Sequence, residues 1–133
     1  MPNDRFYYYN NNPNLFIEND CVTRAISLVT QQSYEDVTDD LFYTGKLYKC
    51  EKLNLYCYEN LLDHVYKMPK ISEAVGMTIE EFSKKYTNGM FLVRVDGHLS
   101  AVINGKIYDI WDCSQKIITD CWFRCWQTAQ NIL

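Results

Sequence analysis

Apolar residues recur every three or four positions in the N-terminal part of the chain, which is the period of an amphipathic helix. The clearest run is Val22, Ala25, Ile26 and Val29. It predicts a helix over residues 21–30, because Asp20 precedes the run and is a favourable N-cap residue. Cys21 would then lie in the first turn of this helix.

Start and stop signals predict three further helices, over residues 34–43, 58–66 and 79–86. The first of these is expected to end at Gly45, because glycine adopts the left-handed conformation that closes many helices. The last begins with a regular capping box, in which Thr78 and Glu81 would each bond the backbone N–H of the other.

The hydrophobic period changes after Gly89 to the alternation that is typical of strands. Four strands are predicted, over residues 90–95, 98–103, 106–111 and 116–123. Residues 1–18 are expected to form an irregular arm, with an edge strand in its Tyr-rich part as an alternative. Helices followed by an antiparallel sheet indicate a single α+β domain over residues 1–133.

Composition limits the classes of partner. The 133 residues carry a net charge of −4 and no cluster of Lys or Arg, which argues against nucleic-acid and membrane-surface binding. The first residues contain no apolar run that would serve as a secretion signal, so a cytoplasmic protein is expected. The six cysteines are then expected to be reduced thiols. Because no Cys-x-x-Cys pair occurs, neither a metal nor another cofactor is predicted.

Cys21 is the first candidate for chemistry. Free backbone N–H groups and the positive end of the helix dipole lower the pKa of a thiol in the first turn of a helix. A nucleophilic cysteine also needs a base, and the chain has two histidines. His64 lies in a predicted helix among apolar residues, whereas His98 follows a turn and opens a strand. His98 is therefore the better candidate for the base.

The predicted hairpin at Asn104-Gly105 selects a third residue. A two-residue turn there places Ser100 opposite Asp109 and His98 opposite Trp111, with all four side chains on one face of the sheet. Asp109 would then lie diagonal to His98, within reach to orient the imidazole. A slip of one residue in the register would put Asp112 there instead. Trp111 would lie beside the pair and keep water away from it.

Two segments resemble a known family. Residues 19–26, Asn-Asp-Cys-Val-Thr-Arg-Ala-Ile, and residues 97–112, Gly-His-Leu-Ser-Ala-Val-Ile-Asn-Gly-Lys-Ile-Tyr-Asp-Ile-Trp-Asp, are similar to small papain-like cysteine proteases from phages and Gram-positive bacteria. The similarity extends to the strand over residues 89–95. It implies a papain-like fold, with Cys21 as nucleophile, His98 as base and Asp109 as orienting residue.

The same resemblance implies an oxyanion hole formed by the Cys21 backbone N–H and an upstream side-chain amide. Papain-like enzymes usually have Gln about six residues before the cysteine, and here that position is Leu15. Asn14 or Asn19 could replace it. Arg24, one turn after Cys21, is expected to pair with Asp20 or Asp112, or to bind a substrate carboxylate.

The resemblance therefore predicts a papain-like hydrolase, encoded by a phage or a mobile element, that cleaves a peptide or isopeptide-like amide in the host cytosol. One alternative is a non-catalytic binding module of the same fold, which sequesters a small-molecule signal or blocks a host defence protein. Another is acyl transfer or deamidation by the same three residues. The partners are accordingly a peptide or protein substrate, or a host component.

Overall fold

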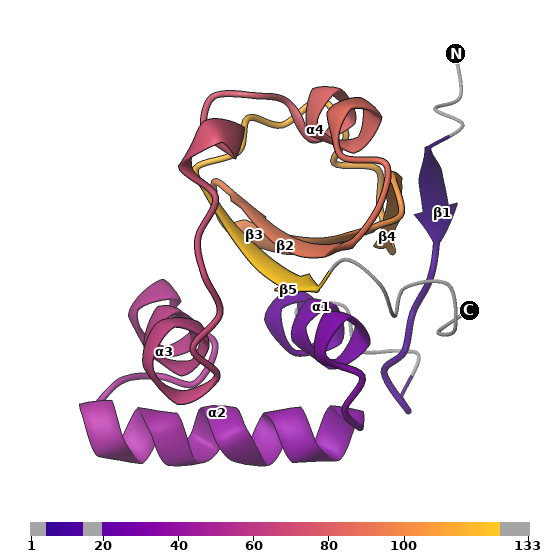
Figure 1. The fold of residues 1–133 in the computed structure, drawn as a ribbon. Helices are drawn as coiled ribbons and strands as arrows, with labels where there is room; N and C mark the ends of the chain where they lie inside the picture. The colour runs from indigo at the N-terminus through magenta and orange to yellow at the C-terminus, as the bar shows by residue number, and fades with distance from the viewer. Residues whose placement is uncertain (1–4, 15–19, 126–133) are drawn as a thin grey trace.

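The computed structural model describes residues 5–14 and 20–125, with only the backbone of the last of these. It is an α+β structure built on a five-stranded mixed sheet with strand order β1-β4-β3-β2-β5. Helix α1 lies against one face of the sheet, with α2 and α3 beyond it, and α4 lies on the other face (Figure 1). The elements in chain order are β1 Phe6–Tyr8, α1 Cys21–Thr30, α2 Tyr34–Tyr48, α3 Leu55–Asn60, the π-helical turn Leu61–Val65, the 3-10 turn Ser72–Ala74, α4 Ile79–Lys85, β2 Met90–Val95, β3 His98–Ile103, β4 Lys106–Asp109 and β5 Asp120–Cys125.

The central hairpin has the register that the sequence predicts. Ala101 pairs with Tyr108 and Ile103 with Lys106, around the turn at Asn104-Gly105. Both turn residues have positive φ, at 51° and 74°, as a two-residue type I′ hairpin turn requires. Strands β2 and β3 match their predicted bounds.

The prediction of a purely antiparallel sheet is wrong at one edge. Strand β1 pairs with β4 in parallel, with Phe6 beside Ile107 and Tyr8 beside Asp109. This strand lies within the N-terminal arm and agrees with the alternative of an edge strand in its Tyr-rich part. Its N-terminal end is anchored, because the Arg5 guanidinium donates to the carbonyls of Ser83 and Gly105.

Strand β4 ends at Asp109 and not at Trp111, because the chain bends there. Oδ1 of Asp109 accepts a 2.7 Å hydrogen bond from the N–H of the next residue, Ile110. The backbone carbonyl of Asp109 accepts a hydrogen bond from the N–H of Tyr9, in the segment that follows β1. The last strand, β5, begins at Asp120 and not at residue 116, because residues 116–118 bond α4 and its cap.

The predicted helices are all present, but some of them begin or end at other residues than predicted. Helix α1 has the predicted bounds, and the Thr78–Glu81 capping box at α4 is present with bonds of 3.0 and 2.8 Å. Helix α2 continues to Tyr48, so the prediction that Gly45 ends it is wrong. The third helical segment begins earlier than predicted, at Leu55, because the Asn54 side chain caps it.

Two apolar clusters fill the spaces on either side of the sheet. One lies between the sheet and α1, α2 and α3, and it includes Met68 and Trp122. The other lies between the sheet and α4, and it includes Phe91 and Phe82.

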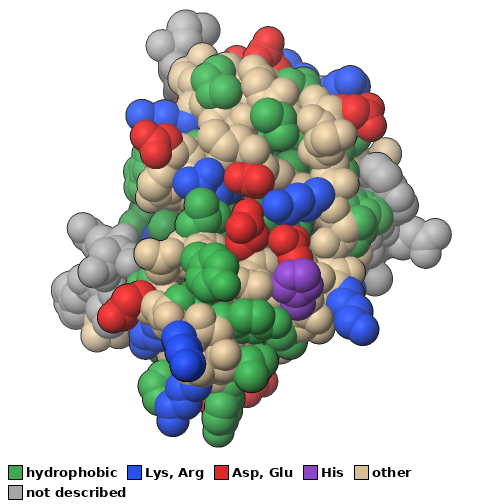
Figure 2. All heavy atoms as spheres, turned by 90° about the vertical axis from the view of Figure 1, so that its left-hand side faces the viewer, with side chains coloured by type: hydrophobic (Ala, Val, Ile, Leu, Met, Phe, Trp, Pro, Cys, Tyr) green, Lys and Arg blue, Asp and Glu red, His purple; other side chains and the backbone are tan. Residues whose placement is uncertain are grey.

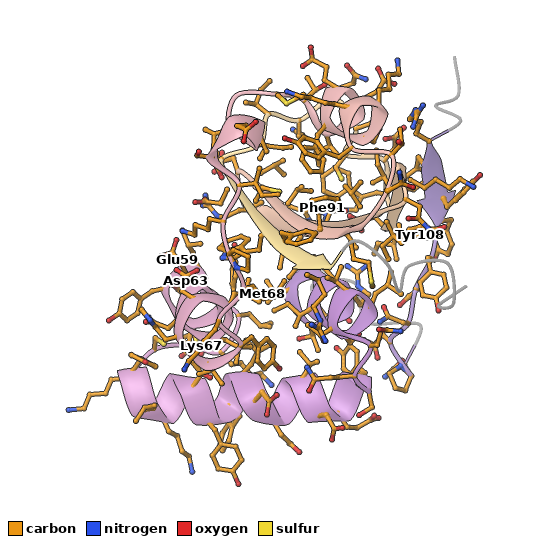
Figure 3. All side chains as sticks on the ribbon, viewed as in Figure 1. Glu59, Asp63, Lys67, Met68, Phe91 and Tyr108 are labelled. Atoms are coloured by element: carbon orange, nitrogen blue, oxygen red, sulfur yellow. The ribbon has the colours of Figure 1, made fainter. Side chains whose placement is uncertain are left out.

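Charged side chains of both signs lie next to one another on the face that carries α3 (Figure 2). Lys70 contacts Glu59, Asp63 and Asp120 there, at 3.3 to 3.7 Å. Figure 3 shows Glu59 and Asp63 on this side of the molecule and places Met68 and Phe91 on opposite sides of the sheet. Among the described residues, no helix has the length and apolar character needed to cross a membrane.

Candidate active site

Cys21 is the first residue of α1, and its side chain is half-buried against β3. Asp20 occupies the N-cap position, as predicted, but its carboxylate accepts no backbone hydrogen bond from the helix. The carboxylate instead binds Arg24, Asn12 and Tyr34. The first N–H groups of α1 are therefore left without a cap from this side chain.

The structure brings His98 and Asp109 together. Nε2 of His98 donates to Oδ2 of Asp109 over 2.6 Å, and the Ser100 hydroxyl donates to the same oxygen over 2.7 Å. All three side chains are buried. This is the shared face that the hairpin register predicts. Because Nε2 is engaged by Asp109, Nδ1 is the ring nitrogen that remains to interact with Cys21.

Asp112, the alternative to Asp109, does not approach the imidazole. Its carboxylate is exposed and accepts a 2.9 Å bond from the backbone N–H of Ser114. Trp111 does lie beside the pair, with its ring centroid 4.5 Å from that of His98. It is 41% exposed, so the indole covers one side of the imidazole from solvent.

The surroundings favour the charged forms of all three groups. Burial acts to raise the pKa of Cys21, but hydrogen bonds from His98 and the Leu99 backbone, together with the charges of His98 and Arg24, outweigh it and lower that pKa. Burial acts to lower the pKa of His98, but hydrogen bonds with Asp109, Cys113 and Cys21 raise it to about 11. Burial likewise opposes ionisation of Asp109, yet the contact with His98 lowers its pKa. These shifts act in the direction of a thiolate beside an imidazolium.

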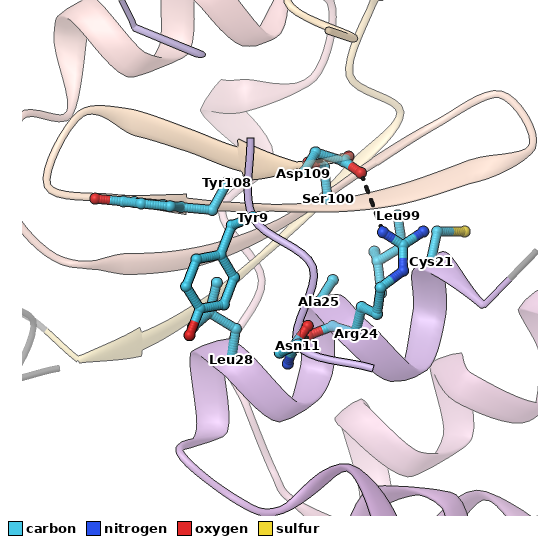
Figure 4. A pocket seen from close by; sticks show the side chains of 10 residues that line it. All are labelled: Tyr9, Asn11, Cys21, Arg24, Ala25, Leu28, Leu99, Ser100, Tyr108 and Asp109. Carbon is cyan, nitrogen blue, oxygen red and sulfur yellow. Dashed lines mark hydrogen bonds and ion pairs between the residues drawn. The ribbon is translucent and has the colours of Figure 1, made fainter. Parts of the chain in front are cut away.

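Arg24 connects the triad to a buried network. Its Nε bonds Oδ1 of Asp20 at 2.7 Å, and its Nη1 lies 3.5 Å from Oδ1 of Asp109 (Figure 4). The expected pairing with Asp20 is therefore confirmed, while the alternative with Asp112 is wrong. The sequence did not predict the contact with Asp109, which joins α1 to β4. The one sequence signal for a role of Arg24 at the site was its spacing of one helical turn from Cys21.

Cys113 is a neighbour that the sequence reasoning missed. Its Sγ donates to Oδ2 of Asp109 over 3.6 Å, and ligand atoms of Cys113, His98 and Asp109 all lie within 4.8 Å of one another. These are metal-ligating residue types. However, the Asp109 carboxylate already accepts four hydrogen bonds, and the charge of Arg24 beside it would repel a cation. Burial also raises the pKa of Cys113 and keeps it a neutral thiol.

Two cavities meet at Cys21. The larger has a volume of about 220 Å³ and is bounded by the loop before α3, by α3 itself and by the start of β3. Its lining is apolar at Val22, Leu53, Leu55 and Leu99 and polar at Tyr58 and Arg94. The smaller cavity, of about 10 Å³, lies between α1 and β4 next to Arg24 and has room for about one water molecule (Figure 4).

Of the two predicted oxyanion amides, the one that the structure describes does not line these cavities. Asn14 is exposed, its backbone N–H donates to Asn12, and it lines neither cavity that contains Cys21. Asn19 lies outside the described residues. Among the described residues, a second donor for an oxyanion therefore has to come from a residue other than Asn14.

Comparisons with known proteins gave no match, whether to a family model, to a curated protein or to a solved structure. The geometry of the site is therefore the basis for a functional proposal. The resemblance to papain-like proteases remains an expectation from the two sequence motifs.

Proposed function

We propose that the protein is a cysteine hydrolase of papain-like fold that cleaves a peptide or isopeptide-like amide, with Cys21 as nucleophile, His98 as base and Asp109 as orienting residue. One observation carries the proposal. The half-buried thiol at the start of α1 interacts with an imidazole whose far nitrogen is held by a buried carboxylate at 2.6 Å. Nucleophile, base and orienting group in this order are the parts that covalent acyl transfer needs.

In this mechanism the Cys21 thiolate attacks the substrate carbonyl, a C–S bond forms, and the carbonyl electrons move to the oxygen. The His98 imidazolium then gives its Nδ1 proton to the leaving amine as the C–N bond breaks. Water, deprotonated by the neutral imidazole, attacks the thioester and releases the acid and the thiolate. Asp109 holds the ring in the orientation that keeps Nδ1 toward Cys21.

The larger cavity is the proposed position for the substrate residue next to the cleaved bond. Its apolar walls at Leu53 and Leu55 are suited to a medium-sized apolar side chain, which would gain about 25 cal/mol for each Å² of apolar surface removed from water.

The reactivity of the individual cysteines tests the proposal. Iodoacetamide alkylation would be followed for each cysteine by mass spectrometry across a pH series, in the wild type and in His98→Ala. The wild type should show Cys21 modified at about pH 6 far faster than an ordinary thiol, whose pKa is about 8.5. Cys57 and Cys121 are internal controls, since burial raises the pKa of each.

Substitution of His98 should remove most of this advantage. If Cys21 in the wild type instead reacts with the pH dependence of a free thiol, there is no ion pair and the proposal fails. A binding module of the same fold would then be the better interpretation. If the ion pair is present, added amines distinguish hydrolysis from acyl transfer, because only acyl transfer incorporates the amine into the product.

A further inference from the structure

The proposed reaction develops a negative oxygen that needs hydrogen-bond donors. The backbone N–H of Cys21 can supply one, because it lies in the first turn of α1 where no carbonyl of the helix can accept it. A second donor has to reach the same oxygen from another part of the cavity wall. None of the described residues that line the larger cavity carries a side-chain amide.

Apart from Cys21 and His98, the described side chains that line this cavity and can donate a hydrogen bond are Tyr58 and Arg94. Tyr58 comes from α3 and Arg94 from β2, whereas Cys21 comes from α1. The Tyr58 ring is buried and packs edge-on against Trp122, with 6.3 Å between the ring centroids. This packing fixes the direction in which the hydroxyl points.

Arg94 determines which part of the Tyr58 hydroxyl is available. The Arg94 guanidinium is held by Thr119 at 2.7 Å and by Asp120 at 3.3 Å, it lines the same cavity as Tyr58, and its charge and hydrogen bonding act to lower the pKa of Tyr58. A guanidinium can only donate a hydrogen bond, so any bond between the two groups is accepted by the Tyr58 oxygen. The phenolic hydrogen is then left to donate elsewhere.

The Tyr58 hydroxyl also keeps its hydrogen over the working pH range. Burial raises the pKa of Tyr58 to about 12, although the charge and hydrogen bond of Arg94 act to lower it. The negative charge of Cys21 adds to the increase, which places the hydroxyl within electrostatic reach of the thiolate. The hydroxyl is therefore a neutral donor close to the nucleophile.

We propose that the Tyr58 hydroxyl and the Cys21 backbone N–H together form the oxyanion hole, with Arg94 as the residue that orients Tyr58. This inference rests on the proposed cysteine chemistry. When the Cys21 sulfur bonds to the carbonyl carbon, the electron pair of the C=O bond moves to the oxygen, and both donors bond that oxygen. When the intermediate collapses, the pair returns and the leaving group departs.

The test uses p-nitrophenyl acetate, which acylates a reactive cysteine without knowledge of the natural substrate. The first turnover releases p-nitrophenolate and can be followed by stopped-flow absorbance, with Cys21→Ser as the background. Tyr58→Phe retains the ring that packs on Trp122 and removes only the hydroxyl. Tyr56→Phe, at an exposed position of the same helix, is the matched control. Iodoacetamide alkylation of Cys21 is measured in parallel, because that displacement forms no oxyanion.

Tyr58→Phe should slow Cys21-dependent acylation at least about tenfold, toward the 10²–10³-fold effect of losing one oxyanion donor, and leave alkylation within about twofold of wild type. Tyr56→Phe should change neither rate. Equal acylation in Tyr58→Phe and wild type would overturn the assignment of Tyr58 and leave the proposed hydrolase intact. An equal loss of acylation and alkylation would also overturn it, because Tyr58 would then act on the thiolate. Absence of Cys21-dependent acylation in the wild type would overturn both proposals.

Discussion

Nη1 of Arg24 lies 3.5 Å from Oδ1 of Asp109, and both side chains are buried. Arg24 also bonds Asp20, so one guanidinium lies between two buried carboxylates. Asp109 in turn bonds His98 on its other oxygen. The stability of the fold and the charge state of the candidate triad are therefore coupled through this arginine.

Replacing Arg24 with Met should destabilise the protein strongly. The substitution leaves the carboxylates of Asp20 and Asp109 buried without their shared cation, a change that costs about 3–5 kcal/mol in comparable buried pairs. Urea unfolding at neutral pH measures the change in the free energy of unfolding. Lys116→Met, at an exposed position, should stay within about 0.5 kcal/mol of wild type. Equal stability of the two variants would contradict this account of Arg24.

Asp109→Asn should reduce the reactivity of Cys21, whereas Asp112→Asn should not. Asn cannot stabilise an imidazolium as a carboxylate does, so the pKa of His98 falls and the Cys21 thiolate loses its partner. Alkylation of Cys21 at about pH 6 should slow at least about tenfold, which corresponds to a change of one pKa unit. Asp112 bonds only a backbone N–H at the surface, in contrast to Asp109. Loss of Cys21 reactivity in Asp112→Asn but not in Asp109→Asn would show that Asp112, and not Asp109, orients His98.

Cys21→Ser should make the stability of the protein depend on pH above about 6.5. In this variant the folded state still holds a proton on His98, whose pKa is raised from 6.5, while the unfolded state has released it. A folded state with one extra proton loses up to about 1.4 kcal/mol of unfolding free energy for each pH unit of increase.

In the wild type this loss is offset by Cys21. The lowered pKa of Cys21 means that the folded thiolate lacks a proton that the unfolded thiol keeps up to its ordinary pKa of 9.0. Urea unfolding at about pH 6.5, 7.5 and 8.5 should therefore show Cys21→Ser falling away from the wild type. Cys57→Ser should run parallel to the wild type, since the raised pKa of Cys57 leaves it a thiol throughout. Parallel curves for all three proteins would contradict the charged pair of Cys21 and His98.

The parts of the site that the sequence predicts are those set by local chemistry. The apolar spacing after Asp20 gave the position of Cys21, and the Asn104-Gly105 turn fixed the register that brings Asp109 to His98. These features depend on residues close together in the chain, so pattern and turn type are sufficient to predict them.

The remaining parts of the site depend on contacts between distant segments. Tyr58 reaches the cavity of Cys21 because α3 packs beside the sheet, and no local signal encodes that placement. The parallel pairing of β1 with β4 likewise joins residues about 100 positions apart. Cys113 reaches Asp109 because the chain bends after β4, where the sequence predicts a continuing strand.

Gly45 illustrates the same limit, because its close neighbour lies beyond the helix. It lies inside α2, where Gly→Ala would normally stabilise a helix by about 0.5–1 kcal/mol. Here an added Cβ would lie 2.6 Å from the backbone oxygen of Cys50, so the chain after the helix would have to move. We expect Gly45→Ala to lower the free energy of unfolding by about 1–3 kcal/mol, as other overpacked sites do. Thermal and urea unfolding would measure the change, with the exposed Leu47→Ala of the same helix as a near-neutral control. A more stable Gly45→Ala protein would show that this contact relaxes at little cost and that the glycine is not required by packing.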